Sequence, residues 1–165
     1  MAYLLDANVF IQAKNLDYQL DVCPAFWNWL LAENEAGRVF SIEKVSDEIK
    51  AAHDELAQWA AARSKTFFLT PDPAMLSALT FVSNWVSGQE YEAAAVSTFL
   101  QGADYYLVAH ALAHSHTVVT PELATESIRT IKIPNLCSGL GIKCITPSEM
   151  LRRERAHFVS GTKGA

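Results

Sequence analysis

The chain has 165 residues, half of them hydrophobic and 19% charged, which is enough for one domain with a sizeable core and excludes a disordered segment. Its formal net charge is -5, with an acidic excess before residue 120 and a basic excess after it. No apolar run reaches membrane-spanning length, and the three cysteines include no CxxC pair, so we expect a cytoplasmic protein with reduced thiols and no membrane partner.

Short apolar runs alternate with helical patterns along the chain, which predicts a three-layer α/β domain around a parallel sheet. In chain order, the expected strands are Ala2–Leu5, Arg38–Ile42, Thr66–Leu69, Thr117–Val119 and Ile142–Ile145. The expected helices run from Pro24 to the residue before Gly37, from Ile42 to Arg63, and over Ala74–Val86, Glu90–Leu100, Ala103–Ser115, Pro134–Leu140 and Pro147–His157. We expect a single domain over residues 1–159 and a frayed tail over residues 160–165.

Four carboxylates fall near one predicted edge of the sheet. Asp6 follows the first strand, Glu48 lies early in the helix after the second, and Glu122 follows the fourth. Asp104 begins the helix that leads into the fourth strand. Because functional crevices of such folds lie beyond the carboxyl ends of the strands, we expect these side chains to approach one another.

Each carboxylate taken alone also has a purely structural explanation. Asp6 could cap a short helix that begins at Ala7, and Asp104 could stabilise the first turn of its helix. Glu48 could form a surface salt bridge, and Glu122 could be an ordinary loop acid. These alternatives remain open at the level of single residues.

Taken together, four acids with no basic residue beside them in sequence could not all stay ionised without a cation. Carboxylate oxygens with room for water suit Mg²⁺ or Mn²⁺. Such ions activate water for hydrolysis of phosphodiester bonds, which needs no side-chain nucleophile. The pattern therefore predicts a metal-dependent phosphodiesterase site.

Four motifs resemble those of the PIN-domain nucleases, which include the toxins of VapBC-type toxin–antitoxin pairs. The motifs are "YLLDANVFI", "VSDEI", "GADYYLVAHA" and "VVTPE", in that order. The C-terminal segment "IKIPNLCSGLGIKCITPSEML" resembles a PIN-like subgroup of bacterial proteins. The resemblance implies a PIN-like fold with a five-stranded parallel sheet. It also implies the metal ligands Asp6, Glu48, Asp104 and Glu122, with supporting roles for Asn8 and Thr120.

The sequence departs from the PIN toxin pattern after the fourth strand. PIN toxins commonly carry an Asn or Asp and a downstream Asp-Phe pair there, whereas this chain reads "TPELATESIRTIKIPN". Glu122 and Glu126 therefore compete for the fourth acidic position.

The resemblance implies a Mg²⁺- or Mn²⁺-dependent endoribonuclease, the toxin of a toxin–antitoxin pair, with RNA as substrate and an antitoxin protein as partner. Two alternatives stay open. One is a catalytically silent PIN-like module that binds RNA or a partner, and the other is a phosphatase of the haloacid dehalogenase type. The phosphatase is disfavoured because Asn8 stands where its second acid would be.

Three further features of the sequence allow more than one interpretation. Arg152 and Arg153 could contact RNA phosphates or simply end a solvated helix. His110 and His114 could face one metal, or be ordinary surface or partly buried histidines. The helix predicted over residues 74–86 is apolar on more than one side, through Phe81 and Trp85, and could pack against a second subunit, an antitoxin segment or the domain itself.

Overall fold

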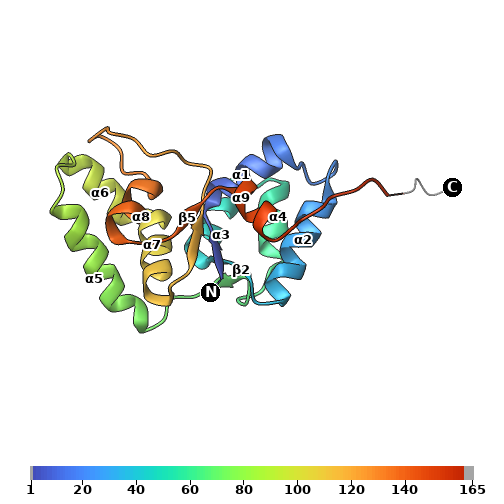
Figure 1. Ribbon diagram of the computed structural model, residues 1–165, viewed down its shortest axis with the longest axis horizontal. Coiled ribbons are helices and arrows are strands. Elements are labelled where there is room, and N and C mark those ends of the chain that lie inside the picture. The colour runs from blue at the N-terminus through green and yellow to red at the C-terminus, as the bar shows by residue number, and fades with distance from the viewer. Residues whose placement is uncertain (1, 162–165) are drawn as a thin grey trace.

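A five-stranded parallel sheet forms the centre of the computed structural model, which describes residues 2–161 (Figure 1). The strands lie in the order β3-β2-β1-β4-β5. Their bounds are β1 Tyr3–Leu5, β2 Val39–Ile42, β3 Phe68–Leu69, β4 Thr117–Val119 and β5 Cys144–Ile145. The predicted α/β class, with about five parallel strands flanked by helices, is confirmed.

Helices flank the sheet on both sides. The helices are α1 Ala7–Gln12, α2 Pro24–Glu35, α3 Glu43–Lys50, α4 Glu55–Ala61, α5 Ala74–Ser87, α6 Ala93–Gln101, α7 Ala103–His114, α8 Ile133–Leu140 and α9 Pro147–Arg153, and the π-helical turn η1 is Ala13–Asp17. Figure 1 shows α5 to α8 on one side of the sheet and α1, α2 and α4 on the other. None of the helices in residues 2–161 is both long and apolar enough to cross a membrane.

The single helix predicted from Ile42 to Arg63 is wrong, because the chain forms α3 and α4 with a break between them. His53 adopts a left-handed backbone conformation with φ of 52°. The carboxylate of Asp54 then accepts a hydrogen bond of 2.9 Å from the backbone N–H of Ala57 and so starts α4. The apolar positions Val45, Ile49, Ala52 and Leu56, whose spacing favours one continuous helix, consequently do not share a buried face, because Ala52 is exposed.

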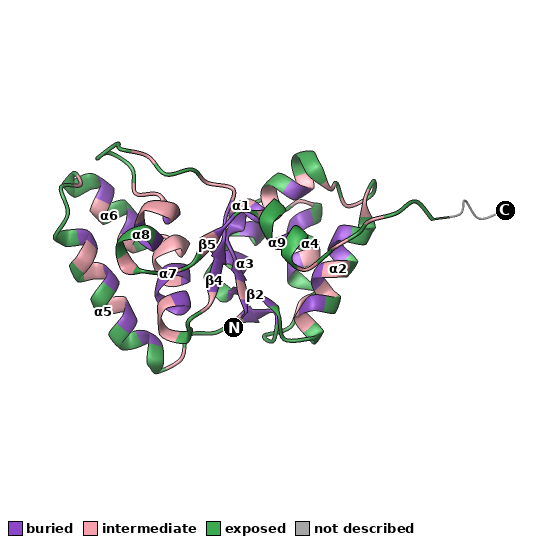
Figure 2. Ribbon diagram, viewed as in Figure 1, coloured by how far each residue is buried: buried purple, intermediate pink, exposed green. Residues whose placement is uncertain are grey.

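The core fills both spaces between the sheet and the helical layers, and the buried faces of the helices turn toward the strands (Figure 2). Strands β1 and β4 are almost fully buried, as expected for the middle of a parallel sheet. After α9 the chain continues along α2, where Phe158 packs edge-on against the rings of Phe26 and Tyr18. Of the tail predicted to fray, residues 162–165 lie outside the described part of the chain.

Candidate active site at the carboxyl edge of the sheet

The two central strands bring Asp6 and Thr120 together. The backbone N–H of Asp6 donates to the carbonyl of Val119, so Asp6 and Thr120 each follow directly after neighbouring parallel strands. The Thr120 hydroxyl donates a 2.8 Å hydrogen bond to Oδ2 of Asp6, and both residues are 1% exposed. Asp6 does occupy the N-cap of α1, but its side chain makes no capping hydrogen bond. The Thr120 hydroxyl therefore holds one oxygen of the Asp6 carboxylate, and the backbone N–H of Asn8, in the first turn of α1, also lowers the pKa of Asp6.

Glu122 is the best-anchored acid of the group. Its Oε2 accepts a 3.0 Å hydrogen bond from the backbone N–H of Ile133, at the start of α8. Its Oε1 lies 3.5 Å from Nδ2 of Asn8 and 3.8 Å from Nζ of Lys132. The backbone N–H of Glu122 also donates to the Thr120 hydroxyl, at 3.1 Å. Asn8 and Thr120, to which the resemblance assigns supporting roles, thus both contact carboxylates of this group.

Two helices supply the remaining acids. Asp104 lies in the first turn of α7, which begins after Gly102, and Glu48 lies in α3. Both line a cavity of about 640 Å³ together with Glu122. The neighbouring Asp47 is exposed and lies 4.0 Å from Lys50, so the helical period separates Asp47 from Glu48.

The four carboxylates act on one another electrostatically. Burial raises the pKa of Asp6 to about 6, and the charges of Glu122 and Glu48 add to the effect, against the lowering influence of the Thr120 hydrogen bond. Burial also raises the pKa of Asp104 to about 7, with contributions from Asp6, Glu122 and Glu48. The pKa of Glu48 is raised by loss of hydration and by Glu122. The group therefore carries more negative charge than its own surroundings compensate.

The donor set of this group fits a hard divalent cation. Within residues 2–161, no three of the His, Cys, Asp and Glu side chains form a ready-made cage for a metal ion. Mg²⁺, however, keeps several of its waters and takes only one or two carboxylates directly, so it does not require such a cage. The carboxylates of Glu48, Asp104 and Glu122 line the cavity, and such mutually repelling carboxylates supply suitable oxygen ligands.

Three basic side chains border the same cavity, and the sequence reasoning missed them. They are Lys44, Arg129 and Lys132. Lys132 lowers the pKa of Asp104, and Lys44 lies over the ring of Tyr106 at 4.7 Å from its centroid. The one signal for Lys132 is its place directly before the Ile133-Pro134 start of α8. For Lys44 and Arg129 we find no signal, because their proximity depends on packing between distant segments.

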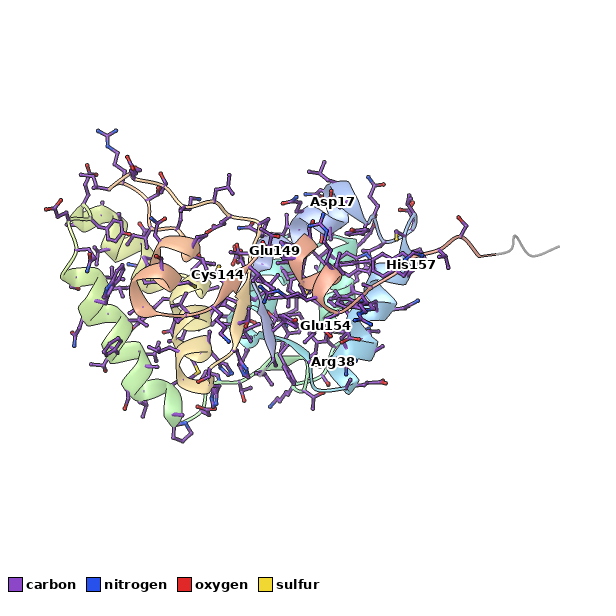
Figure 3. All side chains as sticks on the ribbon, viewed as in Figure 1. Asp17, Arg38, Cys144, Glu149, Glu154 and His157 are labelled. Carbon is purple, nitrogen blue, oxygen red and sulfur yellow. The ribbon has the colours of Figure 1, made fainter. Side chains whose placement is uncertain are left out.

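Other candidates lie elsewhere in the structure. Glu126 is exposed and does not line the cavity, so the structure brings Glu122 and not Glu126 to the other acids. Helix α9 starts near Cys144 and ends at Arg153. The carboxylate of the next residue, Glu154, accepts a hydrogen bond from the Tyr3 hydroxyl and lies 3.7 Å from Nε of Arg38 (Figure 3). Tyr3 and Arg38 mark the amino ends of β1 and β2. Arg152 and Arg153 therefore lie at the opposite edge from the carboxylates.

The histidines also lie away from the four acids. His110 is buried in α7 with Nδ1 3.3 Å from Sδ of Met75, and His114 pairs with Asp72 at 2.6 Å. The ring of His116 stacks on those of His110 and His114 near the end of α7, and the rings of His110 and His114 are tilted against each other. No metal-binding group is found among the described histidines.

Comparisons with known proteins identify a family but no activity. A family model described as "Domain of unknown function (DUF4411)" matches residues 3–158. No curated protein matches the chain. Among solved structures, a chain from the crystal structure of VapBC2 from Rickettsia felis bound to a DNA fragment from their promoter is similar, with a TM-score of 0.49 and 14% identity. That match covers 88% of this chain and 98% of the other.

Proposed function

The chain belongs to the DUF4411 family, described as a domain of unknown function, and we propose that it is a metal-dependent endoribonuclease of the PIN type. The proposal rests on the side chains of the site and on the motifs that resemble PIN-domain nucleases. The reaction is hydrolysis of RNA phosphodiester bonds with Mg²⁺ or Mn²⁺.

One observation carries the proposal: four carboxylates from four separate elements repel one another at the carboxyl edge of the sheet. Capping alone does not explain Asp6, whose carboxylate also accepts a hydrogen bond from the Thr120 hydroxyl. Helix-dipole stabilisation does not explain Asp104, whose pKa is raised and not lowered. Keeping such a group costs stability, which is typical of a functional site.

The four carboxylates would hold the ion, and the remaining side chains would position them and the substrate. When bound, the ion would lower the pKa of a water molecule and offset negative charge on the phosphate. Thr120 fixes the Asp6 carboxylate, and the Ile133 N–H fixes that of Glu122. Lys44 and Lys132 border the cavity and supply positive charge for the RNA phosphates on either side of the reacting bond.

We further propose that the chain is the toxin of a toxin–antitoxin pair, in which an antitoxin protein covers the site or a neighbouring face. The motif resemblance suggests this role, and the outer face of α5 supports it. Phe81 and Leu76 are 57% and 69% exposed there, whereas Trp85 packs within the domain against Gly139. A homodimer through the same face is the second arrangement that such apolar exposure allows.

The proposal is tested by incubating the purified protein with single-stranded RNA in Mg²⁺ or Mn²⁺, with and without EDTA. We expect cleavage that EDTA abolishes. Asp6→Asn and Asp104→Asn should each remove most of the activity, at least about 100-fold, because the ion loses a ligand.

Asp47→Asn is the matched control for the acidic residues, since Asp47 is exposed on the same helix as Glu48. It should retain activity close to that of the parent. RNA binding without cleavage in either metal would instead favour the silent binding module. Trapping of an aspartyl-phosphate on Asp6 would favour the phosphatase.

A further inference from the structure

Two cysteines from different elements share a cavity behind the carboxylates. Cys137 lies in α8 and is 1% exposed, whereas Cys144 begins β5 and is partly exposed. Both line a cavity of about 400 Å³, which also reaches Thr120 and Glu122. The cavity gives a small solute access to the thiols from solvent.

The turn after α8 holds the two cysteines close together. Gly141 ends the helix with φ of 70°, a left-handed conformation that suits glycine. The backbone N–H of Ile142 then donates a 2.9 Å hydrogen bond to the carbonyl of Cys137. The chain consequently returns alongside α8, and Cys137 and Cys144 come to line the same cavity.

The two thiols are unequal first in exposure, because Cys137 is 1% exposed whereas Cys144 is partly exposed and is reached first by a solute. A hydrogen bond from the Cys137 thiol lowers the pKa of Cys144, although burial and the nearby carboxylates act in the opposite direction. The pKa of Cys137 is raised, first by the same hydrogen bond and then by burial. The more exposed sulfur is therefore the better nucleophile, and its buried neighbour is positioned to react with it second.

We propose that Cys137 and Cys144 form a redox-active thiol pair that a peroxide converts to an intramolecular disulfide. The Cys144 thiolate attacks hydrogen peroxide, so that an S–O bond forms, the O–O bond breaks and the leaving hydroxide becomes water. The Cys137 sulfur then attacks the sulfenic acid: the S–S bond forms, the S–O bond breaks, and the thiol proton leaves in a second water. Two thiols are oxidised and one peroxide is reduced. The modification site is independent of the proposed nuclease activity.

The third cysteine provides an internal reference. Cys23 is partly exposed at the start of α2, on the other side of the sheet from α8. It shares no cavity with the pair. A peroxide that reacts according to exposure alone would oxidise Cys23 as readily as Cys144.

The test exposes the folded full-length chain to hydrogen peroxide, alkylates the remaining thiols and maps them by mass spectrometry. We expect a monomer about 2 Da lighter, with Cys137 and Cys144 protected from alkylation and Cys23 still reactive. Dithiothreitol should reverse the change. Cys144 should react roughly tenfold faster than Cys23 in the folded chain, and the difference should disappear in urea.

Variants separate the two steps. Cys137→Ser should leave a sulfenic acid on Cys144 that dimedone traps, whereas Cys144→Ser should leave Cys137 reduced. Cys23→Ser should form the disulfide as the parent does. Equal oxidation of Cys23 and Cys144 in the folded parent, or a parent in which both paired thiols remain open to alkylation, would overturn the proposal, and neither result depends on whether a variant folds.

Discussion

Asp6 is the residue on which the metal hypothesis depends most directly. If the four acids hold an ion, the metal-free protein confines like charges, and Asp6→Asn should relieve part of the repulsion. In EDTA the variant should therefore melt at the same temperature as the parent or higher. In Mn²⁺ at a hundredfold excess over Kd, ligand binding should stabilise the parent by about 2.7 kcal/mol and the variant by less. Calorimetry under the two conditions measures both effects.

The alternative role of Asp6 predicts a different response. Asn is nearly as good an N-cap as Asp, so a purely structural Asp6 would leave the melting behaviour of the two proteins alike in Mn²⁺. Asp47→Asn serves as the control for removal of one negative charge, because Asp47 is exposed and distant from the cavity lining. An identical Mn²⁺ shift in parent and Asp6→Asn would remove Asp6 from the ligand set.

His110 predicts a pH dependence of stability that is separate from the carboxylates. Burial, and then the neighbouring His114 and His116, lower its pKa to about 4. Between about pH 6.5 and pH 4 the unfolded chain therefore binds a proton that the folded chain does not, so stability falls as the pH is lowered through this range. Comparing His110→Gln with the parent by urea unfolding at pH 7 and pH 4.5 should show a smaller loss in the variant, on the order of 1 kcal/mol. Equal losses in the two proteins would contradict the assignment.

At the scale of elements, the contact between α5 and α8 depends on one glycine. A Cβ atom added at Gly139 would lie 2.0 Å from Cζ2 of Trp85, well inside the van der Waals distance. We expect Gly139→Ala to destabilise the fold by about 1–3 kcal/mol, because the indole ring must move. Urea denaturation measures the change.

Replacing Trp85 by the smaller phenylalanine tests whether the clash with the indole ring causes the loss of stability in Gly139→Ala. Gly139→Ala combined with Trp85→Phe should lose less stability than the sum of the two single changes, since the shorter ring leaves room for the methyl group. Gly88→Ala is a control for the effect of replacing a glycine by alanine without a steric clash. A Cβ atom at Gly88 would meet only backbone oxygens, at 3.4 and 3.5 Å, which is ordinary van der Waals contact. Additive losses in the double variant would show that the clash is not responsible.

The elements that were predicted correctly from the sequence are those with strong local signals. Strand Thr117–Val119 has its predicted bounds, and Pro24 and Pro134 mark helix starts because proline suits the first turn. The break between α3 and α4 was missed because the apolar spacing continues across it, while the left-handed His53 and the Asp54 cap carry little weight in a periodic pattern. Helix α9 ends at Arg153, short of the predicted His157, because Arg155 adopts a left-handed conformation.

The positions of the four carboxylates could be predicted from the sequence, because the ends of the strands and the faces of the helices determine them. Asp6 and Glu122 follow strands, and Glu48 and Asp104 follow from helical spacing. Lys44, Arg129 and Lys132 were not predictable, since they meet only where α3, α6 and the segment before α8 border one cavity. A single sequence contains no record of contacts between segments so far apart.

At the scale of the whole molecule, two pairs of basic residues lie at opposite edges of the sheet. Lys44 and Lys132 border the cavity at the carboxyl edge of the sheet. Arg152 and Arg153 are the last two residues of α9 and lie at the amino edge, near Tyr3 and Arg38. A short RNA that fills the cavity can reach only the first pair. The proposal that the two arginines bind RNA therefore requires a strand long enough to pass around the molecule.

RNA length should consequently separate the contributions of the two pairs. We expect Lys44→Gln with Lys132→Gln to weaken binding of short and long RNA alike, and to reduce the slope of log K against log salt by about 1.4, since each phosphate contact on a single strand contributes about 0.7. Arg152→Gln with Arg153→Gln should weaken only the long RNA. All four changes are measured in the Asp6→Asn background, so that cleavage does not consume the ligand during titration. Loss of short-RNA binding from the arginine pair, with no loss from the lysine pair, would place the RNA at the amino edge and separate it from the carboxylates.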